Sequence, residues 1–454
     1  MTNSNLSNVI PAKAGIYTNR SPIGSGMTVF PIIGLEVHVE LTTKSKMFCG
    51  CPADHFGRDP NTQTCPVCLG LPGALPVPNQ QAIEDTIKIG LALNCEVNEN
   101  THFDRKQYFY PDLPKGYQIS QYDQPLCHDG YLTLDSGKKI RILRVHLEED
   151  TGKLQHTTIG SEKVSLVDFN RSGVPLVEIV SEPDLSSSEE AKEYLKKIHA
   201  IVRQLGVTSA DMEKGQMRLE PTVNLNVAGH FTPLVELKNI NSFNFAVTAL
   251  EYEIKRQLSE WQKTGVEKTK SNKTTRGYDS VKKITFPQRL KEEAKDYRYF
   301  PEPDIPPLHI SHTLINQIKD SLPQLPADII AQLTAKGVKT NDAKILSKDK
   351  TALAALRANS GLDQAKLASL IVNKKIDLAA DIEPQFTRLT QIGETDTAKL
   401  VPLIDQVLME NPQVVEDYKK GKITVLGFLV GQVMRATPGA DAKTVSALLV
   451  EKLK

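Results

Sequence analysis

The chain has 454 residues, with 55 Lys and Arg against 54 Asp and Glu, and 40% of its residues are hydrophobic. Because single hydrophobic cores stop growing at roughly 250–300 residues, we expect two or three domains. Because the overall charge is balanced, it gives no argument for nucleic-acid binding. Any contact with nucleic acid would have to come from local basic patches. The few, clustered cysteines do not suit a disulfide framework, and no apolar run reaches the roughly 18 residues of a membrane span. We therefore expect a soluble, cytoplasmic protein.

Residues 1–27 contain Lys13, Arg20, several Asn and Ser, and no acidic residue. This composition permits a transit peptide, but it suits a disordered N-terminal extension better. Met27 stands directly before the first strand-like segment, so translation starting there is a further hypothesis. The intact mass of the native protein would distinguish a start at Met1 from a start at Met27.

The segment from Ile33 to Leu41, IGLEVHVEL, alternates strictly between apolar and polar residues. In a strand, this alternation places Glu36, His38 and Glu40 together on one face, opposite the apolar residues. These side chains form a ready set of metal ligands. A solvated polar face explains the same pattern equally well.

Four cysteines form two close pairs, Cys49 with Cys51 and Cys65 with Cys68, and thirteen residues separate the pairs. This spacing predicts a closed tetrahedral Zn²⁺ site. Because four thiolates leave no open position for a substrate, we expect the zinc to be structural.

Residues 103–121, FDRKQYFYPDLPKGYQISQ, combine basic residues, tyrosines and amides in a Pro-containing loop. Such a composition suits contacts with phosphate and stacking on bases or on a 3′-terminal adenosine. A rigid aromatic loop wedged between a sheet and a helix is an equal alternative.

Two further segments carry acidic residues in unusual places. Three successive carboxylates end at Asp150, where they repel one another unless a cation is near. Glu178 interrupts an apolar run, so it needs a partner such as Mg²⁺ or Arg171, or else it is a structural, salt-bridged glutamate. Carboxylates with an imidazole suit Mg²⁺ beside nucleotide phosphates. The sequence has no phosphate-binding P-loop and no dinucleotide fingerprint, so we expect ATP to bind by another route.

Helical spacing predicts two long helices, over residues 188–205 and 243–264. Ser187 and Glu190 form a capping box for the first, and Gly206 ends it. A proline cluster over residues 301–307 predicts a domain boundary near 308.

The remainder of the chain is rich in Leu, Ala and Lys at helical spacing and holds three aromatic residues, Phe386, Tyr418 and Phe428. We expect a helical domain over 309–400 and a tail domain over 401–454.

Together these motifs resemble the GatB family, the B subunits of the tRNA-dependent amidotransferases, over residues 28–454. The resemblance rests on IGLEVHVEL (33–41), DRKQYFYPDLPKGYQISQ (104–121), HLEEDTGK (146–153), DFNRSGVPLVEIVSEPD (168–184), ELKNINSF (236–243), DYRYFPEPDIPPL (296–308) and GFLVGQVM (427–434).

The family resemblance implies an α+β fold, with a glutamine-synthetase-like antiparallel-sheet cradle domain over 28–308 followed by all-α helical and tail domains. It implies that His38, Glu149 and Glu178 are Mg²⁺ ligands and that Glu36 lies beside them as a fourth catalytic residue. Strand parity instead favours Glu148 over Glu149, so the resemblance requires the strand to have ended before that point.

By the same resemblance, Lys106 and Tyr108 lie near the nucleotide or the acceptor end of the tRNA, and Arg171 is a further cofactor-binding candidate. The Cys₄ site is absent from some family members, which supports a structural role for it. Residues 219–224 are longer than the family's usual segment, so no role is transferred to Glu220 or Asn224.

The implied reaction is ATP-dependent activation of the side-chain carboxylate of Glu-tRNA(Gln) or Asp-tRNA(Asn), followed by attack of ammonia. The chain has no glutaminase signature, so ammonia must come from a partner. The family implies an amidase partner, the A subunit, with the small C subunit completing a heterotrimer, and tRNA binding by the helical and tail domains.

Two other functions are compatible with the motifs. A ligase for a small metabolite would share the Mg²⁺ and ATP site but would not need the last 146 residues. A non-catalytic, zinc-stabilised RNA-binding scaffold would need carboxylates that are merely salt-bridged.

Overall fold

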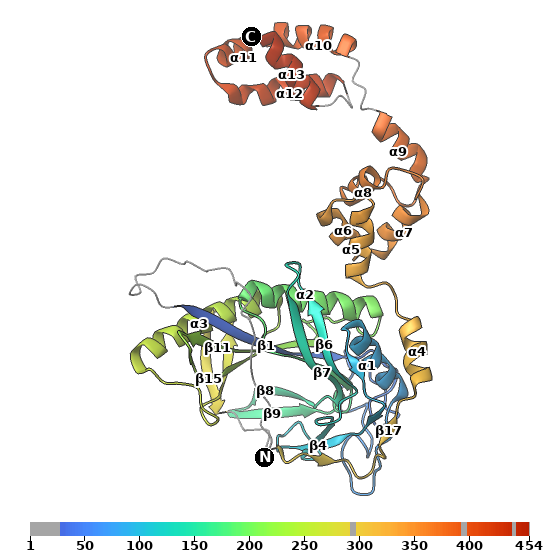
Figure 1. The fold of residues 1–454 in the computed structure, drawn as a ribbon, viewed down its shortest axis with the longest axis vertical. Coiled ribbons are helices and arrows are strands. Elements are labelled where there is room, and N and C mark those ends of the chain that lie inside the picture. Colours follow the sequence, from blue (N-terminus) through green and yellow to red (C-terminus); the bar gives the residue numbers. More distant parts are fainter. Residues whose placement is uncertain (1–27, 291–296, 392–396, 438–441, 454) are drawn as a thin grey trace, which may run out of the picture. The chain divides into compact units, whose positions relative to one another are not determined.

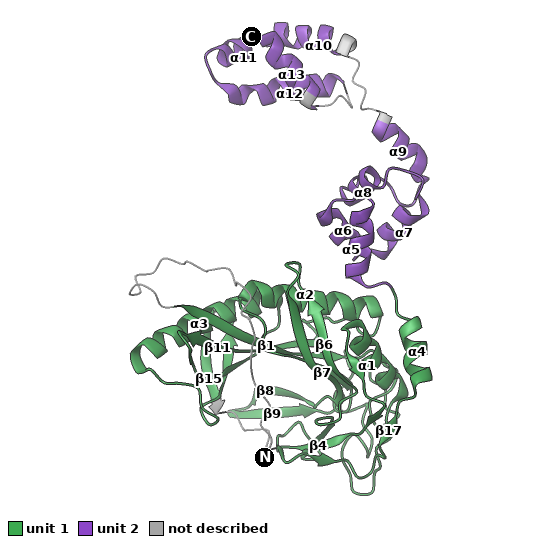
Figure 2. Cartoon of the chain, in the orientation of Figure 1, with its two compact units in different colours: residues 1–323 green, residues 324–454 purple. Residues whose placement is uncertain are grey.

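The computed structural model describes residues 28–290, 297–391, 397–437 and 442–453. The chain forms two compact units, residues 1–323 and 324–454 (Figure 2). The first unit mixes helices and sheet, and the second is helical (Figure 1). The extension expected over 1–27 lies outside the described residues.

The first unit is built on a ten-stranded sheet with the order β15-β14-β13-β11-β1-β10-β7-β6-β2, in which β12 also pairs with β11. Neighbouring strands are antiparallel, except that β13 and β14 are parallel. The strands are β1 (Val29–Glu40), β2 (Glu96–Val97), β6 (Cys127–Thr133), β7 (Lys139–Glu149), β10 (Pro175–Ser181), β11 (Met217–Val227), β12 (His230–Phe231), β13 (Val235–Lys238), β14 (Thr274–Asp279) and β15 (Ile284–Leu290).

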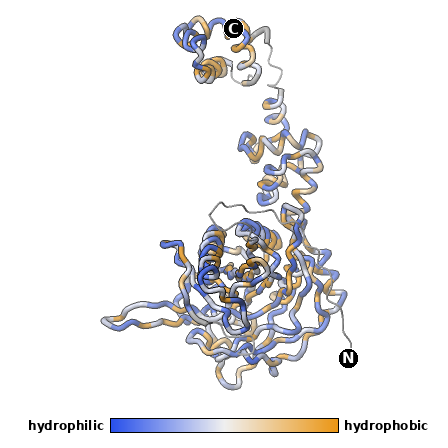
Figure 3. Tube along the Cα trace, turned by 60° about the vertical axis from the view of Figure 1, so that its left-hand side comes forward, coloured by the Kyte–Doolittle hydropathy of each residue, from blue (hydrophilic) through white to orange (hydrophobic). Residues whose placement is uncertain are grey.

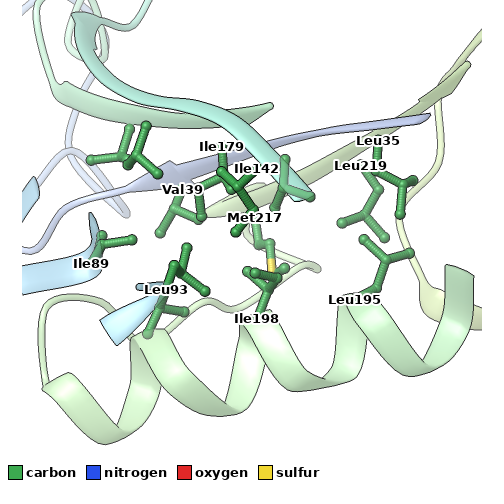
Figure 4. Packing of buried hydrophobic residues seen from close by; sticks show 14 of the residues in the cluster. Leu35, Val39, Ile89, Leu93, Ile142, Ile179, Leu195, Ile198, Met217 and Leu219 are labelled. Carbon is green, nitrogen blue, oxygen red and sulfur yellow. The ribbon is translucent and has the colours of Figure 1, made fainter. Parts of the chain in front are cut away.

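The alternation predicted for residues 33–41 is confirmed. Leu35 and Val39 of β1 are at most 1% exposed, and they face Leu195 and Ile198 of helix α2 (Ser188–Leu205) (Figure 4). Helices α1 (Gln80–Ala92) and α3 (Phe243–Thr264) belong to the same hydrophobic core. Burial of each large aliphatic side chain contributes roughly 1.5–3 kcal/mol, so this packing fixes which face of β1 is left for polar residues.

Both predicted helices are confirmed at their stated ends. The Ser187 hydroxyl accepts the Glu190 N–H, and Gly206 ends α2 with a φ of 73° that favours glycine. The capping box differs in one detail, because the Glu190 carboxylate accepts the N–H of Ser186 at 2.8 Å. Ser242 and Gly265 cap α3 in the same way.

Shorter strands surround the main sheet. Strands β4 (Asp104–Gln107), β5 (Tyr117–Ser120) and β16 (Phe300–Pro301) form a three-stranded sheet. Two-stranded sheets join β3 (Asn100–Thr101) to β17 (Leu308–His309) and β8 (Lys153–Ile159) to β9 (Glu162–Asp168).

The first unit extends past residue 308, where the proline cluster placed the boundary. Ile310 and Ile318 are buried in its core, and helix α4 (His312–Asp320) packs against α1. The prolines therefore lie inside this unit, in the segment that leads from β16 to β17, and the unit ends at Pro323.

The second unit contains two separate hydrophobic clusters, one from Ile329 to Phe386 and one from Leu400 to Leu453. Hydrophobic and hydrophilic residues alternate along its helices (Figure 3), and none of the described helices of the chain is long and apolar enough to cross a membrane. The helices are α5 (Pro326–Ala335), α6 (Thr340–Leu346), α7 (Lys350–Ala358), α8 (Gln364–Val372), α9 (Ile382–Gln391), α10 (Thr397–Glu410), α11 (Pro412–Lys419), α12 (Leu426–Ala436) and α13 (Ala442–Leu453).

Candidate active site

Four neighbouring strands bring one row of polar side chains together. Arg218, His38, Glu178 and His146 are direct partners across β11, β1, β10 and β7, and directly opposed residues project to the same side of a sheet. The Nε2 atoms of both histidines lie 3.4 Å from Glu178 Oε2. Arg144 Nε donates to His146 Nδ1 at 3.3 Å, which leaves His146 Nε2 as the donor to Glu178.

Glu148 stands two residues beyond His146 on the same face of β7. Its Oε2 accepts the Ser120 hydroxyl at 2.9 Å and lies 3.9 Å from His146 Nε2. His38, Glu148 and Glu178 each offer a ligand atom, and these atoms all lie within 4.8 Å of one another. This triad is the candidate cation site.

The structure does not bring Glu149 to this site. The family resemblance required β7 to end before Glu149, but the strand continues through this residue. The expectation that Glu149 points toward His38 and Glu178 is therefore wrong. The Glu149 side chain faces away, where it accepts the Ile119 N–H at 3.0 Å and pairs with Lys115. Strand parity, which favoured Glu148, identified the residue that joins His38 and Glu178.

A cavity of about 730 Å³ opens over the triad. Glu36, Lys106 and Tyr108, which the family resemblance gives as site residues, line this cavity. Its wall is almost entirely acidic, basic and tyrosine side chains, so its ligand must be polar and charged.

Arg171 is placed beside this cavity and not in its lining. Its guanidinium donates to the carbonyl oxygens of Thr151 and Gly152 at 2.9 and 2.7 Å, and its Nε lies 3.7 Å from Asp150. Arg218 pairs with the same carboxylate at 2.7 Å. Arg171 thus holds the turn after β7, and it does not pair with Glu178.

Interactions between neighbouring charged side chains determine the protonation states at the centre of the site. Burial alone would raise the pKa of Glu178, but His146 and His38 lower it to well below its ordinary value. Burial likewise opposes protonation of both histidines, yet Glu178 raises the pKa of each. The pKa of Lys106 is raised well above its ordinary value against burial, chiefly by Glu148. At neutral pH the carboxylates are therefore charged and Lys106 is cationic.

The donor set fits a divalent cation. Among the described residues, the buried Glu178 forms ion pairs with two imidazoles and with no Lys or Arg. Within the same described part of the chain, the buried His38 Nδ1 has no hydrogen-bond partner. Mg²⁺ commonly takes one or two protein carboxylates and completes its shell with water and substrate phosphates. Such a centre would need the space that the cavity provides.

Family models cover nearly all of the chain. The model described as the GatB/GatE catalytic domain matches residues 31–316, and the GatB domain model matches residues 316–453. The chain belongs to the GatB family. Three relatives, each named as the B subunit of aspartyl/glutamyl-tRNA(Asn/Gln) amidotransferase, come from Roseiflexus sp. (strain RS-1), Thermotoga maritima and Rhodopirellula baltica, at 44%, 42% and 41% identity. Each alignment covers 93% of this chain and 96–98% of the relative.

One part of this GatB site was missed by sequence reasoning. Glu220 lies opposite Glu36 in the sheet and lines the cavity. Its carboxylate pairs with Lys238 at 2.6 Å. Burial alone would raise the pKa of Glu220, but the positive charge of Lys238 outweighs burial and lowers this pKa to about 2. Lys238 also contacts Glu236 at 3.0 Å. The alternation of residues 217–227 carried this signal, since it places Arg218 and Glu220 on one face.

The cysteine knuckle, residues 45–68, is a second group of candidate metal ligands that shares no residue with the triad. The sulfur atoms of Cys49, Cys51, Cys65 and Cys68 all lie within 4.8 Å of one another. A thiol hydrogen bond from Cys49 lowers the pKa of Cys68 to about 4 against the effect of burial, and the Lys46 ammonium acts in the same direction. Four clustered sulfurs with a stabilised thiolate are the donor set that Zn²⁺ prefers.

Proposed function

We propose that this chain is the tRNA-binding, carboxylate-activating component of a glutamine-dependent amidotransferase. It converts Glu-tRNA(Gln) and Asp-tRNA(Asn) into Gln-tRNA(Gln) and Asn-tRNA(Asn). The observation that carries the proposal is the triad of His38, Glu148 and Glu178 under a charged cavity, in a chain more than 40% identical to relatives named as B subunits of this enzyme.

The reaction has two steps. The γ-phosphoryl group of ATP passes to an oxygen of the substrate's side-chain carboxylate, which gives an acyl phosphate and ADP. Ammonia then attacks the acyl carbon, the amide forms, and inorganic phosphate and a proton leave. In-line phosphoryl transfer depends mainly on positioning and on stabilisation of charge.

The chain's own residues supply that positioning. His38, Glu148 and Glu178 would hold Mg²⁺, which would neutralise phosphate charge during transfer. His146 fixes the orientation of Glu178, and the Ser120 hydroxyl fixes that of Glu148. Lys106 presents a positive charge to the same cavity, where phosphate oxygens would lie.

The chain requires partners for the complete reaction. The amidase partner, the A subunit, supplies ammonia from glutamine, and the small C subunit completes the heterotrimer. The helices of the second unit bind the tRNA body, mainly through its shape and backbone. Zinc in the cysteine knuckle has a structural role, the protein acts in the cytoplasm, and the first unit has the glutamine-synthetase-like cradle fold.

The test is amide formation on both misacylated tRNAs by the complex purified with its natural partners. The reaction contains ATP, Mg²⁺ and either glutamine or ammonium, beside a His38→Ala control complex. ATP-dependent product from the wild type alone supports the proposal and identifies the preferred tRNA. No product from a wild-type complex that contains the amidase partner would overturn it.

The two alternative functions give different results. A small-metabolite ligase would keep its turnover after removal of residues 324–454, whereas the tRNA-dependent enzyme would lose it. A scaffold would keep partner assembly and tRNA affinity in the His38→Ala complex and would have no activity to lose.

A further inference from the structure

Lys46 lies in the cysteine knuckle and has no exposure to solvent. Its Nζ atom donates hydrogen bonds to the carbonyl oxygens of Gln63 and Phe169, at 2.8 and 3.3 Å, and to the sulfur of Cys68, at 3.6 Å. An ammonium group has three N–H donors, so these three acceptors use all of them. Burial of a positive charge is costly unless a negative partner offsets it. Among the three acceptors, a Cys68 thiolate is the one that carries negative charge.

A zinc ion in the knuckle accounts for this pairing. A cysteine that binds zinc is a thiolate, and four thiolates carry more negative charge than one Zn²⁺ offsets. The Lys46 ammonium adds positive charge directly beside one of them. Groups that hydrogen-bond to metal ligands fix the orientation of those ligands, and their replacement weakens metal binding by roughly 10- to 100-fold. Lys46 has the position of such an outer group.

The same lysine reaches a second segment, the turn of residues 169–173 that follows β9, through the carbonyl oxygen of Phe169. A side-chain carbon placed on Gly173 would lie 3.4 Å from Cys68 and 3.5 Å from Lys46, so the turn packs directly on both residues. Three further hydrogen bonds join the knuckle to the turn. They are Gln63 N–H to Asn170 Oδ1 at 2.8 Å, Ser172 Oγ to the Cys68 carbonyl oxygen at 3.2 Å, and Met47 N–H to the Gly173 carbonyl oxygen at 2.7 Å.

The turn also borders the cavity over the triad. Gly173 N–H donates to the carbonyl oxygen of Asp150 at 2.9 Å, and Asp150 N–H donates to that of Val174 at 2.7 Å. Asp150 lines the cavity, where its carboxylate pairs with Arg218. The turn therefore connects the knuckle to one wall of the cavity.

We propose that Lys46 is a positioning residue of the zinc centre, which binds the Cys68 thiolate and the turn 169–173 together so that zinc binding orders this turn. The inference rests on the zinc site of the proposed function and adds a connection from that site to the cavity wall. Because metal binding and ordering are linked, loss of zinc must loosen the turn, and loss of the Lys46 contacts must weaken zinc binding.

A lysine with a purely structural role would behave differently. It would hold its three acceptors equally well with and without zinc, so its replacement would leave zinc affinity unchanged. The order of the turn would then be independent of the metal. Zinc affinity and the order of the turn are therefore the two quantities that decide the proposal.

The first measurement is zinc affinity, by competition with a chromophoric chelator, in the complex with its natural partners. Lys46→Met keeps the length of the side chain and removes its ammonium group. The affinity should fall by roughly 10- to 100-fold. Lys44→Met is the matched control, because the exposed Lys44 carries the same charge two residues away, and its affinity should not change. Cys65→Ser, which lacks one ligand, gives the background of any zinc bound elsewhere in the complex.

The cobalt-substituted protein gives a spectroscopic signature of the same contact. Co²⁺ bound by the four cysteines has a sulfur-to-metal charge-transfer band. This band should shift in Lys46→Met, since one thiolate loses its hydrogen bond to the ammonium, and should stay in place in Lys44→Met. A change in overall stability alone would not move the band.

The second measurement is amide hydrogen exchange of the turn 169–173. Exchange is followed over times at which β1 stays protected with and without zinc, so that unfolding of the whole unit does not contribute. Removal of zinc by a chelator should speed exchange of the turn in the wild type. In Lys46→Met the turn should exchange fast already with zinc bound, and the chelator should add little. The wild-type comparison needs no variant, so it decides the proposal even if Lys46→Met fails to fold.

Two results would overturn the proposal: wild-type zinc affinity in Lys46→Met, or exchange of the turn that is the same with and without zinc in the wild type. Failure of this inference is distinguishable from failure of the proposed function. If the wild-type complex forms amide but shows either of these results, only the inference falls. If the wild-type complex forms no amide, the proposed function falls.

Discussion

The triad and the cysteine knuckle are two candidate metal sites whose ligands are held in different ways. Backbone hydrogen bonds between β7, β10 and β1 fix His38, Glu148 and Glu178, while the four cysteines lie in residues 45–68, which contain no helix or extended strand. A sheet keeps its ligands in place whether or not an ion is bound. A loop needs the ion to stay folded, so loss of the two metals should have different consequences.

The largest effect should come from replacing a triad carboxylate. Glu178→Gln keeps the shape of the side chain but removes the charge that His38 and His146 share. We expect amidation to fall by on the order of 10³-fold, because metal stabilisation of the transition state contributes several kcal/mol. Single-turnover assays with saturating ammonium measure this loss. Thermal unfolding should change little, and a fall in activity that merely follows unfolding would contradict the expectation.

A pair of neighbouring glutamates sharpens the comparison. Glu148→Gln should weaken binding of Mn²⁺, used as a probe for Mg²⁺, by roughly 10- to 100-fold or more, because a ligand is lost. Glu149→Gln is the matched control, since its side chain bonds to Ile119 and Lys115 outside the triad. Titration followed by electron paramagnetic resonance measures both affinities. Equal losses in the two variants would make Glu149 a candidate ligand again.

The residues of the site also show what the sequence can and cannot predict. Alternation along residues 33–41 predicted one polar face correctly because it depends only on the two-residue period of a strand. Where the strand ends is a tertiary property, and the assumption that β7 stops before Glu149 was wrong. Both helix ends of α2 were predictable because Ser187 and Gly206 act locally.

The remaining parts of the site could not be predicted because they depend on pairing between strands that are far apart in sequence. The contact between Glu178 and His146 depends on the alignment of β10 with β7, and the position of Tyr299 in the cavity lining depends on β16 reaching β4 across almost two hundred residues. Neither pairing has a local signal. The domain boundary near residue 308 was predicted from composition alone. In the structure, Ile318 is buried in the hydrophobic core of the first unit, which ends at Pro323.

Removal of zinc should affect stability more than chemistry. Cys65→Ser leaves three thiolates on a loop, and we expect the free energy of unfolding of this chain within its complex to fall by about 3 kcal/mol, in the range of large single-site losses. Denaturant unfolding with and without a zinc chelator measures it. Chelation should destabilise the wild type and leave Cys65→Ser unchanged. A variant as stable as wild type would show that the cysteines hold no structural metal.

The smallest effect should come from the helix beneath the sheet. The Ser187 hydroxyl accepts the Glu190 N–H at 3.1 Å at the start of α2, and loss of such a cap costs about 1 kcal/mol. Ser187→Ala should therefore lower the midpoint of thermal unfolding by a few degrees, and Ser187→Asp should restore it. Because Leu195 and Ile198 of α2 pack against Val39 and its neighbours on the opposite side of the sheet from the triad, Mn²⁺ affinity should not change. A parallel loss of Mn²⁺ affinity would mean that the sheet alone does not hold the ligands, and that the packing beneath it contributes to their positions.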